Sequence, residues 1–376
     1  MAPDRATQAR AEHPFYRFFH TVAPILTQTI PEEGFVDPDQ LIHRFHALQD
    51  VYEADMARMA EVTDLLFGSD IVAYGPRCTA VFDRWERGCG HKAGCPTLTA
   101  MIAQAVQHFN LDPDDKAVRA AFIGAVLGEI PNDLEYHGND HYRKVLFHTI
   151  RLLSLHNQQA APDDRLDDEQ IALTLAAACI HDLGHPGGDN AKEGVYAPGL
   201  MEQKSFDQAR PYLEAAGLNP EQIGQMETLV FCTDITFFAG DNSPCVRMKK
   251  IYKHYFWDDQ SEDVSMMMMG KLRRYEGNPK LALMAMLLHE ADIGTSAGLS
   301  YERTITETVS FLRERNITLA GPKTVLAFLR DQLGETMFTN AGKQLFGQAM
   351  AQVIEQAEQD ILAGKERFTD EPLFSV

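Results

Sequence analysis

Hydrophobic residues recur three and four positions apart along most of the chain, which places them on one face of an α-helix. The pattern is clearest in eight segments, and it predicts a helix in each: residues 140–156, 168–183, 201–216, 220–236, 279–294, 300–316, 322–335 and 339–363. Strand signals are scarce, and no Asn-Gly or Asp-Gly pair joins two alternating runs into a hairpin. The pattern therefore predicts an all-α fold, a compact multi-helix bundle.

Polar residues, glycines and prolines separate these segments. Residues 167–169, Asp-Asp-Glu, suit the start of a helix, because carboxylates there accept from unpaired backbone N–H groups. Gly184 and the Pro-Gly-Gly of residues 186–188 end the same helix, so the pair His181-Asp182 falls on its last turn. We expect loops at 157–166, 186–200 and 239–248, and a mobile, Met-rich connection at 257–278.

The length of 376 residues and the 45% of hydrophobic residues allow a large core, in one big domain or two ordinary ones. Residues 1–125 look helical but carry no recognisable catalytic motif, whereas the candidate catalytic residues all follow. We therefore place a boundary near residue 125. Residues 1–125 are expected to form a helical region packed on, or continuous with, a domain of residues 126–376.

The net charge of −20 disfavours binding to nucleic acid or to anionic membranes, since both need an excess of Lys and Arg. No signal-peptide core or membrane span is recognisable, and six scattered cysteines suggest reduced thiols. We expect a cytoplasmic protein with a small-molecule partner, and a homodimer is compatible with the sequence. If that partner is an anion, a local cation such as a metal has to offset the overall negative charge.

Three segments bring histidines and carboxylates to the ends of apolar helices. Residues 136–148 contain His137, His141 and His148, of which the last two would share a helix face. His181 and Asp182 end a second apolar run, and residues 289–292, His-Glu-Ala-Asp, end a third. Buried carboxylates need a cation or strong donors, and imidazole and carboxylate are common ligands of transition metals. The set predicts a metal site inside a helical core.

The order of these motifs resembles that of the HD-domain metallophosphohydrolases, and most narrowly that of the class I cyclic-nucleotide phosphodiesterases. The matching residues are Tyr136-His137-Gly138-Asn139-Asp140-His141, then His181-Asp182-Leu183-Gly184-His185-Pro186-Gly187-Gly188-Asp189-Asn190, then His289-Glu290-Ala291-Asp292. Met201-Glu202-Gln203 and Cys232-Thr233-Asp234 are further partial matches. The resemblance covers residues 130–335 and implies a phosphodiesterase-like catalytic domain.

The resemblance also implies roles for individual residues. His141, His181, Asp182 and Asp292 would hold a tight metal, commonly Zn²⁺, and Asp182 would also reach a second metal, Mg²⁺ or Mn²⁺. His137 matches the acid that protonates the leaving group. His185 and Glu202, and less closely Asp234, match groups that surround the metals or the substrate phosphate. The implied reaction is hydrolysis of 3′,5′-cyclic AMP or cyclic GMP to the 5′-nucleotide.

These residue types suit that reaction. Two cations would offset the charge of a phosphodiester and lower the pKa of a bridging water, so that a hydroxide attacks phosphorus. An imidazole outside the metal shell can then protonate the departing sugar oxygen near neutral pH, since its ordinary pKa is about 6.5. The metals would also act as a local anion trap inside an acidic protein.

The chain departs from the family pattern where the base would bind. Phe328 in Pro322-Lys323-Thr324-Val325-Leu326-Ala327-Phe328 occupies the position of the stacking Phe, but Val325 replaces the Gln that hydrogen-bonds the purine. Gln332, one helical turn after Phe328, is a candidate substitute. Gly138 replaces the family's Asn beside the expected acid, with Asn139 adjacent. The substrate is therefore less defined than the metal chemistry.

Three alternatives stay open at this stage. The chain is a cyclic-nucleotide phosphodiesterase, an HD phosphohydrolase for a nucleoside monophosphate or another phosphoester, or a metal-free binding module. Four further residues could hold a structural zinc: Cys78, Cys89, His91 and Cys95. The alternative is that they are ordinary loop thiols and a loop imidazole.

Overall fold

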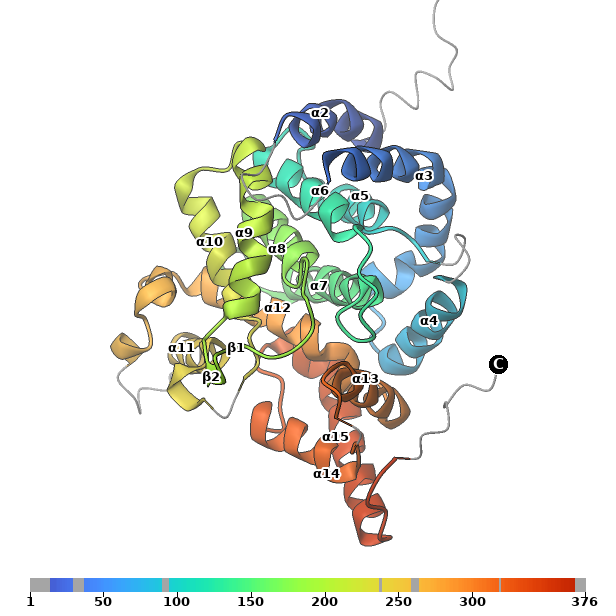
Figure 1. Cartoon of the computed structure of the whole chain (residues 1–376), viewed down its shortest axis with the longest axis vertical. Coiled ribbons are helices and arrows are strands. Elements are labelled where there is room, and N and C mark those ends of the chain that lie inside the picture. The colour runs from blue at the N-terminus through green and yellow to red at the C-terminus, as the bar shows by residue number, and fades with distance from the viewer. Residues whose placement is uncertain are drawn as a thin grey trace, which may run out of the picture.

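The chain folds into helices around one apolar centre, as Figure 1 shows for this computed structural model. The structure describes residues 14–29, 37–89, 95–236, 239–257, 264–317 and 319–368. Its α-helices are α2 (Pro14–Gln28), α3 (Pro38–Phe67), α4 (Tyr74–Cys89), α5 (Leu98–Phe109), α6 (Lys116–Gly128), α7 (Asn139–Gln159), α8 (Asp168–Ile180), α9 (Leu200–Ala215), α10 (Pro220–Phe231), α11 (Pro244–Phe256), α12 (Pro279–Gly298), α13 (Tyr301–Glu314), α14 (Pro322–Leu326) and α15 (Asn340–Leu362). The all-α prediction is confirmed.

Short elements fill the connections between these helices. Four are 3-10 turns: η1 (Pro162–Asp164), η2 (Gly240–Asn242), η3 (Val264–Met266) and η4 (Gly270–Tyr275). A fifth, η5 (Ala327–Gln332), is π-helical and continues α14. Two two-residue strands, β1 (Ala191–Lys192) and β2 (Val195–Tyr196), form an antiparallel hairpin.

Seven of the eight predicted helices are present with ends that shift by a few residues, whereas the one predicted at 322–335 is divided into the short α14 and the π-helical η5. Asp167 caps α8 in the way its sequence predicts, since its side chain accepts from the Gln170 N–H while Gln170 reaches back to the Asp167 N–H. The loop predicted at 239–248 is wrong in its second half, because α11 starts at Pro244. Pro at the first turn of a helix is favourable, and Ser243 caps it from the preceding position. The hairpin of β1 and β2 was not predicted, because two-residue strands carry no alternation signal.

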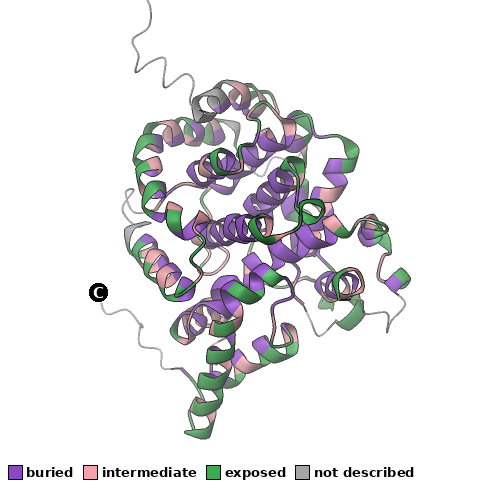
Figure 2. Ribbon diagram, turned by 180° about the vertical axis from the view of Figure 1, so that it is seen from behind, coloured by how far each residue is buried: buried purple, intermediate pink, exposed green. Residues whose placement is uncertain are grey.

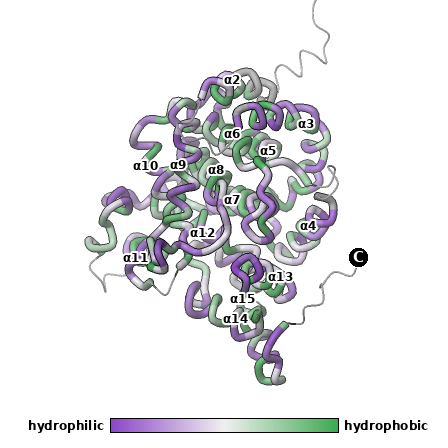
Figure 3. The backbone as a smooth tube through the Cα atoms, viewed as in Figure 1, coloured by the Kyte–Doolittle hydropathy of each residue, from purple (hydrophilic) through white to green (hydrophobic). Residues whose placement is uncertain are grey.

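The helices α7, α8 and α12 cross the centre of the molecule, and α6 packs along α8. Buried residues concentrate on these helices, whereas exposed residues alternate with buried ones along α3 and α4 and prevail at the far end of α15 (Figure 2). The apolar residues follow the same pattern in the hydropathy view (Figure 3). α8 and α12 are apolar around most of their circumference, which is typical of helices surrounded by protein. The polar residues at their ends therefore differ from the apolar remainder of each helix.

The N-terminal helices pack directly on this centre. α2, α3 and α5 cover α6, and α3 and α5 also contact α7. Buried charges connect α4 to the rest, because Glu86 pairs with both Arg303 of α13 and Lys144 of α7, the latter at 3.1 Å. The boundary near residue 125 falls within α6 and stays a prediction.

The cysteines differ from the expectation at one position. Cys78, Cys179, Cys232 and Cys245 are free and buried, but Cys95 is disulfide-bonded. The predicted reduced state is therefore wrong for Cys95, whose sulfur is not available as a thiolate ligand for zinc. His91 and the side chain of Cys89 lie outside the described residues. In the described part of the chain, no helix has both the length and the apolar character needed to cross a membrane.

Candidate active site

Three central helices bring the expected metal ligands together. His141 lies on the first turn of α7, His181 is the residue directly after α8, and Asp292 lies on α12. Asp182 follows His181, and Gly184 then reverses the chain with a φ of 65°, a left-handed conformation that glycine adopts without strain. Each helix is held by its apolar faces, so the four side chains converge on one point without depending on a flexible loop.

The donor atoms of this cluster have the spacing of ligands around one cation. His141 Nε2 lies 3.1 Å from Asp292 Oδ1 and 3.4 Å from Asp182 Oδ2. His181 Nε2 lies 3.1 Å from Asp182 Oδ2, 3.8 Å from Asp292 Oδ1 and 3.4 Å from His141 Nε2. Ligands about 2.1 Å from a common ion lie about 3.0 to 3.4 Å from one another in octahedral or tetrahedral geometry. The cluster therefore fits a divalent metal, and His141, His181 and Asp292 form one of two such groups by spacing alone.

The imidazoles are oriented for this role. His181 Nδ1 lies 2.9 Å from the Ala178 carbonyl oxygen, so a neutral ring donates there and presents the lone pair of Nε2 to the cluster. Both histidines are buried, with exposures of 2% or less. Burial opposes a charge on His141, but its hydrogen bonds to Asp182 and Asp292 raise its pKa to about 9. Burial likewise opposes the Asp182 charge, yet His181 and His141 hold the pKa of that carboxyl well below its ordinary value.

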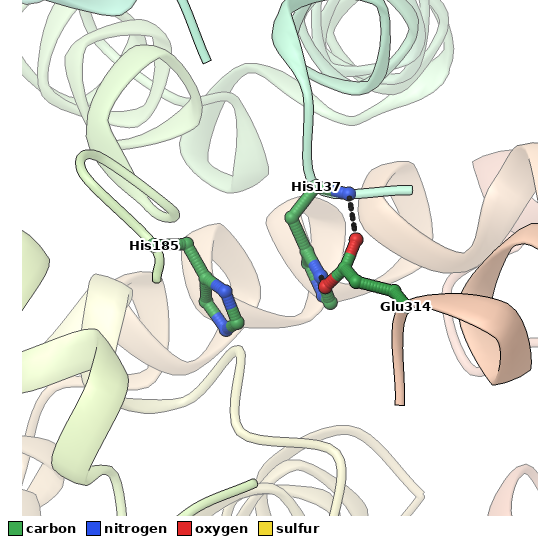
Figure 4. A group of neighbouring side chains, drawn as sticks. All are labelled: His137, His185 and Glu314. Carbon is green, nitrogen blue, oxygen red and sulfur yellow. Dashed lines mark hydrogen bonds and ion pairs between the residues drawn. The ribbon is translucent and has the colours of Figure 1, made fainter. Parts of the chain in front are cut away.

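A second group of His and carboxylate lies beside the first. Figure 4 shows His137 with Glu314 on one side and His185 on the other. His137 Nδ1 lies 2.5 Å from Glu314 Oε1, and the backbone N–H groups of Tyr136 and His137 both donate to Glu314 Oε2 at 3.1 Å. Burial alone would raise the pKa of Glu314, but these donors lower it to about 2. Glu314 thus stays charged and fixes His137 through Nδ1, leaving Nε2 for another partner.

His185 completes this second group. Its ring stacks on that of His137, with centroids 4.1 Å apart and planes 17° apart. Burial, with the nearby His137, lowers the pKa of His185 to about 4, so its ring is neutral near pH 7. His185 Nδ1 accepts from the Gly187 N–H at 3.0 Å. By spacing, His137, His185 and Glu314 also form a group that could hold a metal ion.

Glu202 and Asp234 lie on the far wall of the same site. Asn190 donates to Glu202 Oε1 at 3.2 Å, while Glu202 Oε2 is buried without a partner among the described residues. Burial raises the pKa of Glu202 well above its ordinary value, and Asp234 and Asp182 add to the effect. Asp234 accepts from the Tyr196 hydroxyl at 2.6 Å and from the Gly199 N–H at 2.8 Å. An unpartnered carboxylate oxygen near Asp182 fits a site for a second cation or its water shell.

The cavity of about 60 Å³ above these groups contains only part of the expected base pocket. Phe328, on the π-helical turn η5, lines it together with His137, Asp182, His185 and Asp292. Val325 is fully buried in the core, and the described wall of the cavity does not include Gln332. A larger cavity, about 1000 Å³, lies between α3, α7 and α13. Its most deeply buried charges are already paired, as in Lys144 with Glu307 at 2.7 Å, so the smaller cavity is the better candidate for chemistry.

Other residues from the sequence motifs have structural surroundings. His148 is fully buried between the Tyr74 hydroxyl at 2.9 Å and the Thr295 hydroxyl at 3.0 Å, and it does not join the metal cluster. His289 is buried beside Cys245. Gly138 is explained by space, since a Cβ there would lie 2.4 Å from the Leu134 carbonyl oxygen. Glu314 was missed because an acidic residue at the end of an amphipathic helix is ordinary in a sequence.

Comparison with known proteins gives the fold. The phosphodiesterase domain of the Salpingoeca rosetta rhodopsin phosphodiesterase is 15% identical, with 71% of this chain and 88% of that chain covered and a TM-score of 0.49. LmjPDEB1 in complex with IBMX is 14% identical, with 76% and 91% covered and a TM-score of 0.50. No protein-family model matches the chain, and no curated protein matches it by sequence. The second likeness, with its TM-score of 0.50, shows that the chain has the class I phosphodiesterase fold, and at this identity it shows the fold alone.

Proposed function

We propose that this chain is a metal-dependent phosphodiester hydrolase that converts 3′,5′-cyclic nucleotides to 5′-nucleotides. The observation that carries the proposal is the pairing of two different His–carboxylate groups at one cavity. One presents imidazole and carboxylate donors at metal-ligand spacing, and the other holds a histidine by a charged carboxylate. Hydrolysis of a phosphodiester needs both positive charge and a proton donor.

His141, His181, Asp182 and Asp292 would hold the tight metal, with Zn²⁺ as the proposed ion. Asp182 would also contribute to a second site for Mg²⁺ or Mn²⁺, with Glu202 and Asp234 beside it. Bound divalent cations would supply the charge that offsets the phosphodiester anion and activates water for attack on phosphorus. Asn190 and the two hydrogen bonds to Asp234 keep these carboxylates in place around the site.

His137 is the proposed proton donor. Its Nδ1 is engaged with Glu314, so Nε2 is the ring nitrogen left to deliver a proton to the departing sugar oxygen at the cavity that His137 lines. Glu314 orients the ring by accepting at Nδ1, as in other acid–base pairs with an orienting carboxylate. The stacked His185 keeps the His137 ring from rotating, and it excludes water from one face. Glu314 acts through His137 and is therefore a positioning residue.

A second substrate class is supported by one observation. The cavity is small, about 60 Å³, and the position expected to carry a purine-binding Gln is the buried Val325. Sites for drug-sized ligands usually have about 300 to 1,000 Å³. Cavity size does not separate a cyclic nucleotide from a nucleoside 5′-monophosphate, which has the same base, but the absent Gln contact leaves such a phosphomonoester, or another and smaller phosphoester, as the alternative substrate on the same machinery.

A substrate panel distinguishes these proposals. Protein supplied with Mn²⁺ is incubated with cyclic AMP, cyclic GMP, 5′-AMP, 5′-GMP and bis(p-nitrophenyl) phosphate, and the products and bound metals are measured. The proposal expects 5′-nucleotides from the cyclic substrates. Release of phosphate from 5′-nucleotides alone would move the assignment to the second class. Bound metal with no hydrolysis of any ester would contradict both.

A further inference from the structure

Arg315 is a cationic side chain at the same cavity that no sequence motif indicated. It follows Glu314 at the end of α13 and lines the cavity with Phe311 and Phe328. Its guanidinium carbon lies 3.9 Å from the centroid of the Phe311 ring, close enough for stacking. Its side chain is 27% exposed, so most of it is covered by protein.

The guanidinium has donors to spare. Nη1 pairs with Asp189 Oδ1 at 3.1 Å, and Nη2 donates to the Gly188 carbonyl oxygen at 3.3 Å. Nε is buried with no partner among the described residues. Because a guanidinium carries five N–H donors and no acceptor, most of its capacity is unused in this arrangement. Its charged partner Asp189 is 68% exposed, so that ion pair is easily exchanged for another.

We propose that Arg315 is the specificity residue for the base, and that it selects guanine over adenine. This inference rests on the proposed function and names the substrate within it. Guanine presents two acceptors, O6 and N7, on one edge, whereas adenine presents the N7 acceptor beside the N6 donor. The planar guanidinium can donate to both acceptors of guanine, whereas on adenine one of its N–H groups would face the N6 donor. Phe311 and Phe328 supply aromatic walls for a planar base.

Binding of the base would exchange one set of hydrogen bonds for another. The cavity of about 60 Å³ is smaller than a purine needs, so Arg315 has to leave Gly188 and Asp189 when the nucleotide enters. That movement frees Nη1 and Nη2 for the acceptor edge of guanine. Arg315 thereby supplies the base contact that Val325, buried in the core, does not.

A second phosphate on the substrate would suit Arg315 less well than the edge of a base. Glu314 and Asp234 are close enough to influence Arg315 electrostatically, and Asp189 pairs with it. The guanidinium is thus surrounded by negative charge, which repels a further phosphate but tolerates a neutral base edge. The local charge favours guanine over a second phosphate.

Two measurements test the inference, one with turnover and one without. The first is the ratio of kcat/KM for cyclic GMP to that for cyclic AMP. The second is calorimetric binding of 5′-GMP and 5′-AMP to the metal-loaded protein. We expect a guanine preference of about 10- to 100-fold in both, the range of one bidentate base contact. Arg315→Gln should reduce it to about threefold, because an amide offers one donor and one acceptor and can pair with either base.

Two further variants keep the test decisive. Arg313→Gln is the matched control, and it should leave the preference unchanged, because Arg313 lies on the same helix and its side chain pairs with the exposed Glu135 at 3.4 Å, outside the cavity lining. Asp189→Ala changes an exposed residue and removes the competing partner of Arg315, so 5′-GMP should bind about threefold more tightly.

Each failure has its own signature. A wild-type protein that binds 5′-AMP as tightly as 5′-GMP, or a preference that survives in Arg315→Gln, would overturn the role of Arg315. Tighter binding of nucleoside 3′,5′-bisphosphates whatever the base would assign Arg315 to a second phosphate instead. If no ester is hydrolysed but 5′-GMP is still preferred through Arg315, the proposed function fails and the base selection stands.

Discussion

The two His–carboxylate groups at this site have similar composition but different hydrogen bonding. At the first, the carboxylates of Asp182 and Asp292 face imidazole nitrogens at 3.1 to 3.8 Å, and no described backbone N–H donates to them. At the second, Glu314 accepts from one imidazole and two backbone N–H groups. Without backbone donors, the first pair of carboxylates depends on imidazole protons or on a cation, whereas Glu314 with its three donors is already satisfied.

This difference teaches that residue spacing alone does not identify a metal site. Both groups have ligand atoms close enough to share an ion. The stacked rings of His137 and His185 point in nearly parallel planes, 17° apart, instead of converging with their nitrogens on a point. We therefore assign the metal to the first group and the proton to the second, and the predictions below test that division.

The largest effect is expected from the first group. Asp182→Ala removes a carboxylate that contacts both His141 and His181, and it is the proposed shared ligand. Hydrolysis should fall by about 10³-fold or more, because the charge that offsets the phosphodiester is lost with the metal. Metal analysis of the same sample should show less bound ion. Normal turnover in this variant would contradict the two-metal proposal.

A smaller effect is expected from the second group. His137→Ala should lower kcat for cyclic nucleotides by about 10²- to 10⁴-fold, the usual contribution of a general acid. Glu314→Gln should lower it less, since the ring remains but loses its charged partner. Bis(p-nitrophenyl) phosphate, whose leaving group needs no proton, should be affected least. Both variants should keep their metal, and equal losses on the two substrates would argue against proton donation.

Glu202 tests whether a second metal binds beside the first group. Its unpartnered oxygen and raised pKa suit a neighbouring cation, so Glu202→Gln should weaken the second metal. Outer residues of metal sites typically contribute about 10- to 100-fold in metal affinity. The Mn²⁺ concentration that gives half-maximal activity should rise by that factor while the tight metal stays bound. Gln208, whose Oε1 is also buried without a described partner but which does not line the cavity, provides the matched control as Gln208→Glu.

The smallest effect concerns stability, at the buried histidine that belongs to neither group. Burial lowers the pKa of His148 to about 3, below the value of about 6.5 in an unfolded chain. The unfolded state therefore takes up a proton first, and stability falls as the pH drops from about 6.5 toward 3. Between pH 6.5 and 5 the loss should be about 2 kcal/mol.

Denaturant unfolding at several pH values measures this contribution. His148→Gln removes the titrating ring and should flatten the acid dependence, although the variant is less stable at pH 7. His46→Gln, at an exposed histidine that hydrogen-bonds Gln49 and lies beside the Phe45 ring, should keep the wild-type slope. An unchanged slope in His148→Gln would show that His148 is not the group responsible.

The sequence patterns predicted two kinds of feature: the positions of single helices, and site residues that stand in unusual pairs. The apolar faces located seven of the eight helices, and His181-Asp182 stood out because neither side chain suits a helical core unpaired. The patterns could not predict Glu314 or Arg315, since charged residues at the end of a helix are ordinary until the fold carries them next to His137 and His185. Nor could they predict which of Val325 and Phe328 reaches the cavity. The helix changes to π geometry between these two residues, and a π-helical turn has no sequence signature.

The most direct test of the account is the location of the metal. Crystals grown with Mn²⁺ can be measured near the zinc and the manganese absorption edges, and anomalous difference maps then show where each ion binds. We predict strong density in contact with Asp182 and Asp292, between His141 and His181, and none in contact with Glu314. Density bound by Glu314 with His137 and His185, or no density at Asp182 and Asp292 under conditions of turnover, would contradict the account.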